Sequence, residues 1–535
     1  MSSNCKYIFV TGGVTSSLGK GIVASSLAVL LQGRGLRVTI QKLDPYLNVD
    51  PGTLNPYEHG ECFVTNDGAE TDLDLGHYER FLSVPMSKRN NVTTGSVYEK
   101  IIKRERKGDF LGKTVQVIPH VTNEIKNRIT ALASKNQDVI ITEIGGTVGD
   151  IESLPYIETV RQLKFEKGSD AIVIHLTLVP YLSATEELKT KPTQHSVKNL
   201  LQLGVQPDVL VCRAEINLGK DLKNKIALFC NVNSDSVIES IDASTIYDVP
   251  LLLLKQKLDL VVLEKLGYKN IKRLNIKKWN DFLIKLKNPT KKVKIAIVGK
   301  YVELKDAYKS ISESLIHGGV FNNCEVKIKW VHSEDVKSKS VANIFRNCSG
   351  IVVAPGFGER GISGKLITIQ YARTKNISFL GICLGMQMAV VEFARNVIGL
   401  KTAHSTEINA KTKYPVIDLM QNQKVLLNKG GTMRLGSYKC KLLNKKSKTF
   451  NAYKKDLIEE RHRHRYEFNN DFLDEFKKSD MRFVGLNPES GLVEILELKN
   501  HKWFVGVQFH PEYKSTVINP HPLFKSFIKS TILKK

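Results

Sequence analysis

The sequence lacks the features that mark zinc-binding, secreted and membrane proteins. Its eight cysteines form no Cys-x-x-Cys pair and no His/Cys spacing of the zinc type, which argues against a structural zinc site. Apolar runs such as "VPLLLL", 249–254, fall far short of the roughly 20 residues that span a bilayer. The N-terminal residues lead directly into a strand-like segment, so no signal peptide is indicated. We therefore expect a protein of the reducing cytoplasm, without a membrane partner.

Acidic residues are in the minority. The chain has 79 Lys and Arg against 54 Asp and Glu, a formal net charge of +25, which suits a partner that carries phosphate groups. It has no Arg-rich tract and no stripe of interleaved aromatic residues, and Lys is spread along its whole length. We therefore expect phosphorylated small molecules as partners, and no nucleic acid.

The chain is too long for one ordinary core, since it has 535 residues. In its first part, a strand-like segment at 6–13, a helix-like segment at 20–35 and a second strand-like segment at 37–44 form a strand, helix, strand unit. Further apolar runs at 138–146 and 171–180 are typical of strands buried on both faces. The fold class predicted is α/β, with a mostly parallel sheet and flanking helices.

A second domain of the same class is predicted after a Lys- and Asn-rich stretch. New strand-like segments begin at 293 and recur at 350–358, 376–387 and 502–512. We expect a first domain over 1–270, a linker over 271–290 and a second domain over 291–535. The sequence shows no internal repeat.

The loop "TGGVTSSLGKG", 11–21, lies between a strand and a helix and predicts a phosphate-binding loop. Its backbone N–H groups and the helix N-terminus would cradle phosphates, and Lys20 would neutralise them. Gly21 stands where such loops carry the Ser or Thr that holds magnesium. Carboxylates must then replace this hydroxyl, and the candidates are Asp74 and Glu143. A plain turn, an acidic surface loop and a strand-end charge are the alternatives for these residues.

The stretch "GICLGMQ" places Cys383 at a sharp turn from strand to helix, where a nucleophile is exposed beside free backbone N–H groups. His510 and Glu512 in "VGVQFHPE" are two residues apart. We expect them on a strand, where both side chains leave from one face, so that Glu512 orients His510 and His510 serves Cys383. The alternative for Cys383 is a buried structural cysteine.

Long stretches of the first half resemble the amidoligase domain of the CTP synthase family, including 6–22, 42–81, 143–153 and 189–198. The resemblance implies that magnesium is held by Asp74 and Glu143. It assigns ATP to Ser17, Leu18, Gly19, Lys20, Gly21, Ile22, Lys42 and Asp74, with Ile241, Asp242 and Ala243 at the adenine. It assigns UTP, and the triphosphate of CTP, to Ser16, Lys189, Thr190, Lys191, Pro192, Thr193, Gln194 and Lys225, with Asp150, Ile151 and Glu152 at the base of CTP.

The second half resembles a class I glutamine amidotransferase, with Cys383, His510 and Glu512 as its triad. The resemblance assigns glutamine to Gly356, Leu384, Gly385, Met386, Gln387, Glu407 and Arg465. One departure is Pro355, where many relatives carry a glycine. Because Gly356 keeps its own amide, we expect the change to be tolerated.

The resemblance as a whole implies an enzyme of pyrimidine biosynthesis that aminates UTP to CTP. ATP would phosphorylate O4 of UTP, and ammonia released from glutamine through a thioester on Cys383 would travel along a covered passage to displace the phosphate. The family further implies Mg²⁺, activation by GTP with Arg434 of the lid-like "GTMRLGSY", 431–438, as its contact, inhibition by CTP, and a homotetramer.

Two other readings stay open at this point. A cobyric-acid-type amidase also joins a ligase to an amidotransferase-like domain, but it resembles proteins that lack the triad glutamate, and Glu512 is present here. A nucleotide-binding assembly protein without catalysis is the second alternative, and the intact triad argues against it.

Overall fold

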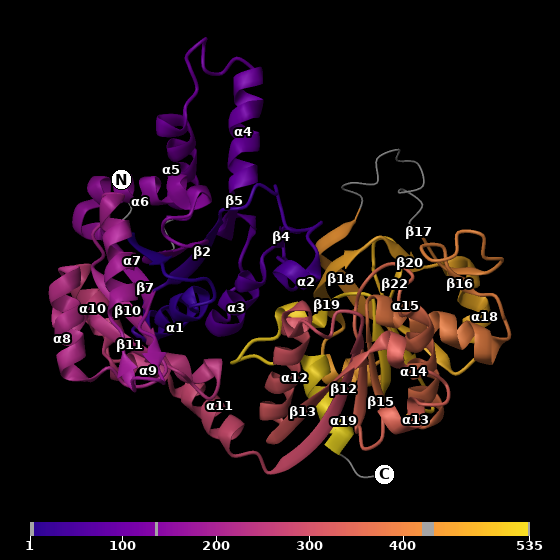
Figure 1. Ribbon diagram of the computed structural model, residues 1–535. Helices are drawn as coiled ribbons and strands as arrows, with labels where there is room; N and C mark the ends of the chain where they lie inside the picture. The colour runs from indigo at the N-terminus through magenta and orange to yellow at the C-terminus, as the bar shows by residue number, and fades with distance from the viewer. Residues whose placement is uncertain (1–4, 134–136, 420–432, 533–535) are drawn as a thin grey trace. The chain divides into compact units, whose positions relative to one another are not determined.

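The computed structural model describes residues 5–133, 137–419 and 433–532 and divides into two compact units. One comprises 1–53 and 77–283, and the other comprises 54–76 and 284–535. Helices and strands alternate through both (Figure 1), so the predicted α/β class is confirmed. Across the described ranges, no helix is both long and apolar enough to cross a bilayer.

The first unit is built on a parallel sheet, which in the described chain has seven strands. Its order is β11 (Val237–Ile241), β10 (Val209–Ala214), β7 (Ala171–Leu178), β1 (Lys6–Gly12), β6 (Val139–Ile144), β2 (Val38–Asp44) and β5 (Asn91–Thr93). Every residue of β2 and β6 is buried, as expected of strands covered on both faces. Parallel strands end at one edge, which brings the loops after β1, β6, β7 and β11 together.

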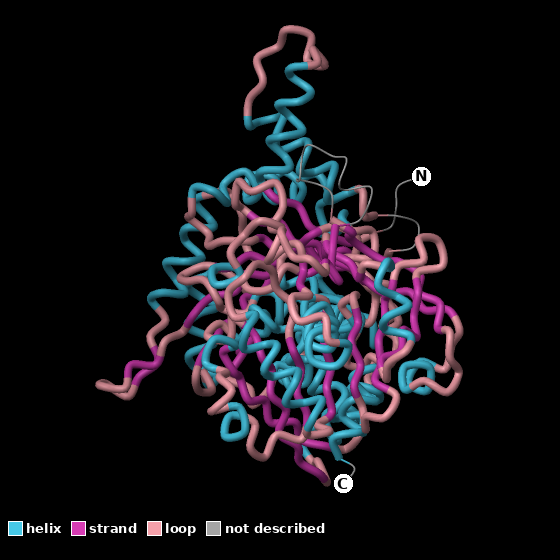
Figure 2. The backbone as a smooth tube through the Cα atoms, turned by 90° about the vertical axis from the view of Figure 1, so that its right-hand side faces the viewer, coloured by secondary structure: helices cyan, strands magenta, loops and turns pink. Residues whose placement is uncertain are grey.

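Helices flank this sheet. They are α1 (Lys20–Gly33), α3 (Leu73–Leu82), α4 (Thr94–Arg106), α5 (Thr122–Thr130), α6 (Leu154–Lys167), α7 (Lys191–Gln202), α8 (Gly219–Cys230), α9 (Val249–Lys255), α10 (Leu258–Lys265) and α11 (Lys277–Lys287). Tyr7 and Phe9 of β1 share a core with Ile157 and Val160 of α6. Figures 1 and 2 show α4 and the loop after it extending away from the sheet.

The second unit contains a mixed sheet, with nine strands among the residues described. Its order is β13 (Cys324–His332), β12 (Lys291–Gly299), β14 (Gly350–Val353), β15 (Ser378–Ile382), β23 (Phe504–Val507), β22 (Val493–Leu498), β21 (Met481–Leu486), β18 (Arg434–Leu442) and β19 (Leu457–His464). The strands from β13 to β23 run parallel, and the rest pair antiparallel.

Two helical layers cover this sheet because β12 alternates its side chains. Ile295 and Ile297 pack in a core with α12 (Lys309–Phe321) and α19 (Pro522–Ile532). Ala296 and Val298 pack in another core with α14 (Ile362–Thr374) and α15 (Leu384–Phe393). Smaller elements of this unit are α13 (Val341–Ile344), β16 (His404–Ser405), β17 (Pro415–Leu419), α17 (Lys448–Tyr453), β20 (Tyr466–Phe468) and α18 (Leu473–Lys477).

The division differs from the predicted domains in two places. Segment 54–76, with α2 (Pro56–His59), β3 (Phe63–Val64) and β4 (Glu70–Thr71), clusters with the second unit, because its side chains bond to residues far along the chain. The predicted linker contains α11, whose Trp279 is buried and donates from Nε1 to the carbonyl of Tyr247 at 3.0 Å. Residues 271–283 therefore pack with the first unit.

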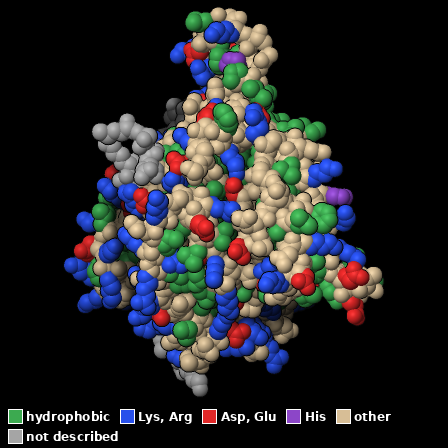
Figure 3. Space-filling model, turned by 90° about the vertical axis from the view of Figure 1, so that its left-hand side faces the viewer, with side chains coloured by type: hydrophobic (Ala, Val, Ile, Leu, Met, Phe, Trp, Pro, Cys, Tyr) green, Lys and Arg blue, Asp and Glu red, His purple; other side chains and the backbone are tan. Residues whose placement is uncertain are grey.

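The surface agrees with the sequence in how positive charge is distributed. Figure 3, which shows one face of the molecule, has Lys and Arg side chains scattered among other types, without a continuous basic stripe.

Candidate functional site

Cys383 lies at the sharp turn that the sequence predicted, between β15 and α15. Its φ of 50° and ψ of −106° are strained for a residue with a Cβ. Two glycines allow the turn, because a Cβ on Gly381 would lie 2.8 Å from the Gly385 backbone and one on Gly385 would lie 2.2 Å from the Val353 oxygen. The glycines of the G-x-C-x-G pattern are thus explained by close packing.

His510 and Glu512 meet as expected, but they do not lie on a strand. β23 ends at Val507, and His510 caps a short 3-10 helix over Pro511–Lys514. Pro511 between them has no N–H for a strand ladder, and the helical turn brings Glu512 Oε1 within 2.7 Å of His510 Nδ1. The expected contact is present, while the expected strand geometry is wrong.

The electrostatics of this pair favour a charged imidazole. Burial alone lowers the pKa of His510, but the carboxylate of Glu512 outweighs it, and the net pKa rises to about 10. The sulfur of Cys383 also raises this pKa, without meeting the geometry of a hydrogen bond. Within the described ranges, the buried Nε2 has no hydrogen-bond partner, so it is available to a nucleophile or a leaving group.

A glutamine that the sequence analysis did not single out contacts Cys383. Gln508 is fully buried and its Nε2 lies 3.7 Å from Cys383 Sγ. Its Oε1 accepts from Gln387 Nε2 at 3.4 Å, and Gln387 also donates to the carbonyl of Tyr466 at 2.9 Å. The position of Gln508, two residues before His510 in "VQFHPE", is the signal that could have singled it out.

The segment around Gly356 is held from both sides by lysines. Lys365 is fully buried and donates from Nζ to the carbonyl of Ala354 at 2.8 Å, while Lys300 Nζ donates to the carbonyl of Phe357. Burial lowers the pKa of Lys365 to about 7. Gly356 itself has a φ of +153°, a backbone region that favours glycine.

The residues expected to bind glutamine lie around this turn. Leu384, Gly385, Met386 and Gln387 form the buried first turn of α15. Glu407 accepts from the Gly358 amide at 2.7 Å, which ties it to the segment that holds Gly356. Arg465 is half-buried, and its buried Nε has no hydrogen-bond partner in the part of the chain that the structure describes. An unsatisfied buried donor favours an anionic ligand group at this position.

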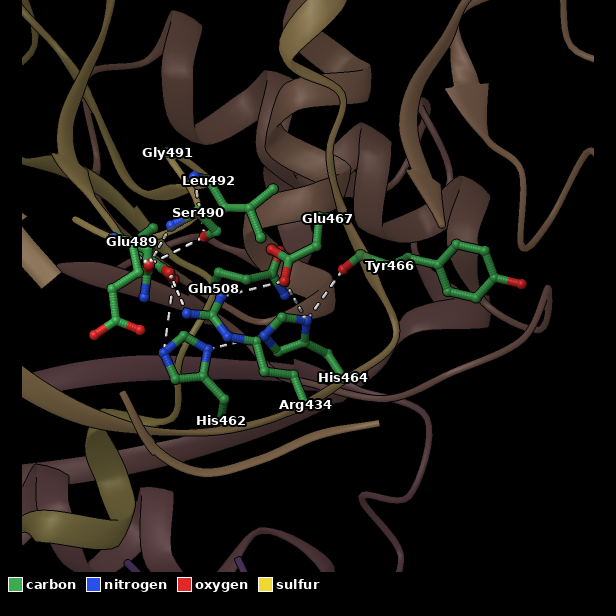
Figure 4. A network of polar contacts seen from close by, with 12 residues as sticks. Arg434, His462, His464, Tyr466, Glu467, Glu489, Ser490, Gly491, Leu492 and Gln508 are labelled. Carbon is green, nitrogen blue, oxygen red and sulfur yellow. Dashed lines mark hydrogen bonds and ion pairs between the residues drawn. The ribbon is translucent and has the colours of Figure 1, made fainter. Parts of the chain in front are cut away.

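Arg434 occupies a buried ion cluster (Figure 4). Its guanidinium lies 3.2 Å from Glu467 Oε1 and 2.7 Å from Glu494 Oε1, and it is 6% exposed. Burial raises the pKa of both carboxyls. His462 and His464 adjoin the cluster, with 2.8 Å between their ring nitrogens.

The predicted contact of Arg434 with GTP stays a prediction. It would require this guanidinium to leave two carboxylates. Residues 431 and 432 of the lid-like stretch lie outside the described residues.

The predicted phosphate loop follows β1 and leads into α1. Ser16 and Ser17 are exposed, Ser17 has a φ of 59°, and Gly19 caps α1 with a φ of 90°. The loop therefore presents its backbone to solvent at the helix N-terminus. Leu18 is buried, Gly21 and Ile22 lie in the first turn of α1, and Lys20 Nζ donates to the carbonyl of Gly146 at 2.7 Å.

Glu143 lies near the end of β6, beside Lys42 in the register of β2. Its Oε1 lies 2.9 Å from Lys42 Nζ, and its Oε2 accepts from the hydroxyl of Tyr78.

Asp74 is not in a loop: it lies in the first turn of α3 and clusters with the second unit. No group of three or more His, Cys, Asp or Glu side chains that could hold a metal is found in the described ranges. Carboxylates supplemented by nucleotide phosphates still fit Mg²⁺, which keeps few protein ligands, and the Asp74 and Glu143 assignment stays a prediction.

The residues expected at the pyrimidine nucleotide lie at the carboxyl edge of the first sheet. Lys189, Thr190, Lys191, Pro192, Thr193 and Gln194 form the turn into α7. Thr193 donates to the carbonyl of Leu178 at 2.9 Å, and His175 of β7 joins Thr11 of β1 to Ser196 of α7 by contacts of 2.9 and 2.8 Å. This histidine ties the helix to the strand that precedes the phosphate loop.

The remaining expected residues lie in exposed or half-buried positions. Asp150, Ile151 and Glu152 are exposed, and Asp150 Oδ2 accepts from the Thr147 amide at 2.9 Å. Lys225 is exposed on α8. Ile241 is the last residue of β11, and Asp242 and Ala243 follow it; Arg213 pairs with Asp242 at 2.5 Å. Their contacts with nucleotides stay predictions.

Comparison with known proteins covers both halves. Residues 6–268 match the family model described as CTP synthase N-terminus, and residues 303–530 match that of glutamine amidotransferase class-I. The CTP synthase of Christiangramia forsetii is 62% identical over 99% of this chain and 97% of its own. That of Flavobacterium psychrophilum is 62% identical over 99% of both chains. Among solved structures, the glutaminase domain of Trypanosoma brucei CTPS with bound acivicin is 34% identical over 45% of this chain and 95% of that one, with a TM-score of 0.42.

Proposed function

The chain belongs to the CTP synthase family, and on that premise we propose that it aminates UTP to CTP, with ATP as the phosphate donor and glutamine as the nitrogen donor. The observation that carries the glutamine half is the buried His510–Glu512 pair at 2.7 Å, beside a cysteine at a strained turn. A structural cysteine needs neither a strained turn nor a histidine with an unpaired nitrogen.

Hydrolysis of glutamine would begin with attack of the Cys383 sulfur on the side-chain amide carbon. The backbone amides of Gly356 and Leu384 would receive the oxyanion, and His510 would give its proton to the departing ammonia. The thioester is then cleaved by water, which His510 deprotonates, and glutamate leaves. Glu512 keeps the imidazole oriented and stabilises its charge. The guanidinium of Arg465, whose Nε has no hydrogen-bond partner among the residues described, and the carboxylate of Glu407 would supply charges for the two ends of the amino-acid group.

Amination of UTP would need activation of its O4, because a carbonyl oxygen is a poor leaving group. Transfer of the ATP γ-phosphate to O4 makes the oxygen able to depart as phosphate when ammonia attacks C4. The exposed residues Ser16 and Ser17 and the N-terminus of α1 support phosphate binding, and Lys20 would neutralise the transferred group. Lys42 of β2 pairs with Glu143 of β6, the strand that lies between β2 and β1 in the sheet.

Magnesium is part of the proposal, with Glu143 and Asp74 as its protein ligands. Bound Mg²⁺ would neutralise charge on the transferring phosphoryl group. Binding would require Glu143 to share or release its present partners, Lys42 and Tyr78. The two carboxylates fit a metal that prefers hard oxygen ligands.

Regulation and assembly follow from the same premise. We propose inhibition by CTP at the triphosphate contacts of UTP, activation of glutamine hydrolysis by GTP, and a homotetramer.

The test is to supply the purified protein with UTP, ATP, Mg²⁺ and glutamine and to follow absorbance of the cytosine ring. Cys383→Ala is expected to abolish glutamine-dependent synthesis and to retain synthesis from ammonium salt. Lys20→Ala is expected to lose both while still releasing glutamate from glutamine. A wild-type protein that forms no CTP from either nitrogen source would refute the proposal.

A further inference from the structure

The ring of Tyr513 lies parallel to the imidazole of His510. The two ring centroids are 5.0 Å apart and the planes differ by 9°, which is an offset-stacked arrangement. Both side chains are buried, His510 at 3% exposure and Tyr513 at 6%. The stack therefore forms one wall of the space in which the imidazole sits.

The imidazole needs such a wall because its other restraints are few. Among the residues described, the ring hydrogen-bonds only through Nδ1, to Glu512. One hydrogen bond fixes the direction of Nδ1 but lets the ring turn about the bond axis, which would move the opposite nitrogen. The backbone is held, since the His510 amide donates to the carbonyl of Arg461 at 2.8 Å. What remains to be fixed is the plane of the ring, and a parallel aromatic face does this.

Tyr513 is in turn held by segment 62–66 of the second unit. Its hydroxyl donates to the carbonyl of Cys62 at 3.0 Å, and burial raises its pKa, so the phenol stays protonated and able to donate. The ring of Phe63 meets the tyrosine edge to face, with 5.1 Å between centroids. The tyrosine is thus clamped on a side away from the histidine.

Arg461 completes this support. Its guanidinium is 2% exposed and lies 5.4 Å from the centre of the Phe63 ring. It donates from Nε to Asn66 Oδ1 at 2.6 Å and from a terminal nitrogen to the carbonyl of Val64 at 3.1 Å. The same residue whose carbonyl anchors His510 therefore fixes the segment that holds Tyr513.

We propose that Tyr513 is a positioning residue for glutamine hydrolysis, and that its ring, braced by Phe63, holds the His510 imidazole in the plane that serves Cys383. The inference rests on the proposed hydrolysis at Cys383. The ring is the working part, and the hydroxyl only helps to hold the ring in place.

The experiment compares Tyr513→Phe, which keeps the ring, with Tyr513→Leu, which removes it. We expect the phenylalanine variant to release glutamate within about threefold of the wild-type rate, and the leucine variant to lose on the order of 10²-fold in kcat, the scale of a 1 Å misplacement. The KM for glutamine is expected to stay within about threefold of the wild-type value in both variants, because other residues bind the substrate. Synthesis of CTP from ammonium salt reports whether each variant is folded.

A second readout is the rate at which iodoacetamide alkylates Cys383 at pH 7.5, followed by mass spectrometry. We expect slower alkylation in the leucine variant than in the wild type and the phenylalanine variant, because an imidazole turned out of its plane no longer serves the sulfur. A change confined to packing elsewhere would leave this rate unchanged.

Two results would overturn the inference: a leucine variant with wild-type glutamate release, or a phenylalanine variant as slow as the leucine variant. If the leucine variant also loses ammonia-dependent synthesis, it is not folded, and Phe63→Leu replaces it as the test. That variant is expected to release glutamate roughly tenfold more slowly than the wild type, and an unchanged rate would contradict the inference. A wild-type protein that releases no glutamate would instead refute the proposed function.

Discussion

The carboxylate of Glu61 accepts hydrogen bonds from the backbone amide of Ser310, at 3.0 and 2.9 Å from its two oxygens, although the residues are 249 positions apart. Ser310 lies in the first turn of α12, where backbone amides lack partners within the helix. An acidic side chain there also complements the helix dipole. One contact thus joins segment 54–76 to the second unit.

Replacing Glu61 should therefore loosen this segment. Glu61→Ala is expected to lower the free energy of unfolding of the second unit by about 0.5–2 kcal/mol, the range for a lost helix cap. Hydrogen exchange of residues 60–71 is expected to speed up with it. Glu58→Gln, an exposed change in the same segment, is the matched control, and equal exchange in the two variants would contradict the expectation.

Glu512→Gln should slow glutamine hydrolysis by roughly 10²–10⁴-fold, since the neutral amide neither stabilises the imidazolium nor selects its tautomer. Glutamate release measures this, and ammonia-dependent synthesis serves as the control for folding. The pair also affects stability. The pKa of His510 is raised from 6.5 to about 10. The charged imidazole therefore stabilises the folded state fully below pH 6.5, and this stabilisation is lost as pH rises towards 10. A glutamine variant with wild-type hydrolysis would exclude this role for the carboxylate.

His175 should make the first unit sensitive to acid. Burial, with a smaller effect of Lys20, lowers its pKa from 6.5 to about 3, so its neutral form stabilises the fold above pH 6.5. As pH falls from there towards 3, stability should decrease by about 1.4 kcal/mol per pH unit. His175→Asn is expected to be less stable at pH 7.5, because its links to Thr11 and Ser196 are lost, but to lose less stability on acidification.

Hydrogen exchange of β1 and β7 at pH 7.5 and 5.5 would measure this in the first unit. His195→Asn, an exposed change on α7, is the matched control. Equal acid sensitivity of His175→Asn and the wild type would show that another group is responsible.

Arg434→Met should destabilise the second unit, by about 3–5 kcal/mol, because it leaves Glu467 and Glu494 buried without their cation. Burial raises the pKa of both carboxyls above 4.5, so they can be protonated at pH 6. The variant should therefore lose less free energy of unfolding at pH 6 than at pH 8. Urea unfolding at the two pH values measures the difference, with Lys441→Met, an exposed change on the same strand, as the control. A stable variant that loses only activation by GTP would instead favour the predicted nucleotide contact.

Local sequence was enough for much of the fold and for the places of the candidate sites. Apolar runs such as 139–144 predicted buried parallel strands, and turns rich in glycine marked the candidate phosphate loop and the turn at Cys383. These signals are local. The periodic pattern of buried side chains, the reversal of the chain at a turn and the close approach of two backbone segments each depend on a few consecutive residues. The contact between His510 and Glu512 also followed from their spacing, although Pro511 makes the backbone there helical and not extended.

By itself, then, the sequence determined the α/β class, the residue types at the two candidate sites and the family of the chain. Only the tertiary structure decided that 54–76 packs on the second unit, that Arg434 is enclosed by two carboxylates and that Tyr513 lies against His510. Gly68 and Gly436 illustrate the reason: a Cβ on Gly436 would lie 2.7 Å from the Gly68 amide nitrogen. Such contacts join residues hundreds of positions apart, and they form only when whole elements pack together, so no pattern within either segment encodes them.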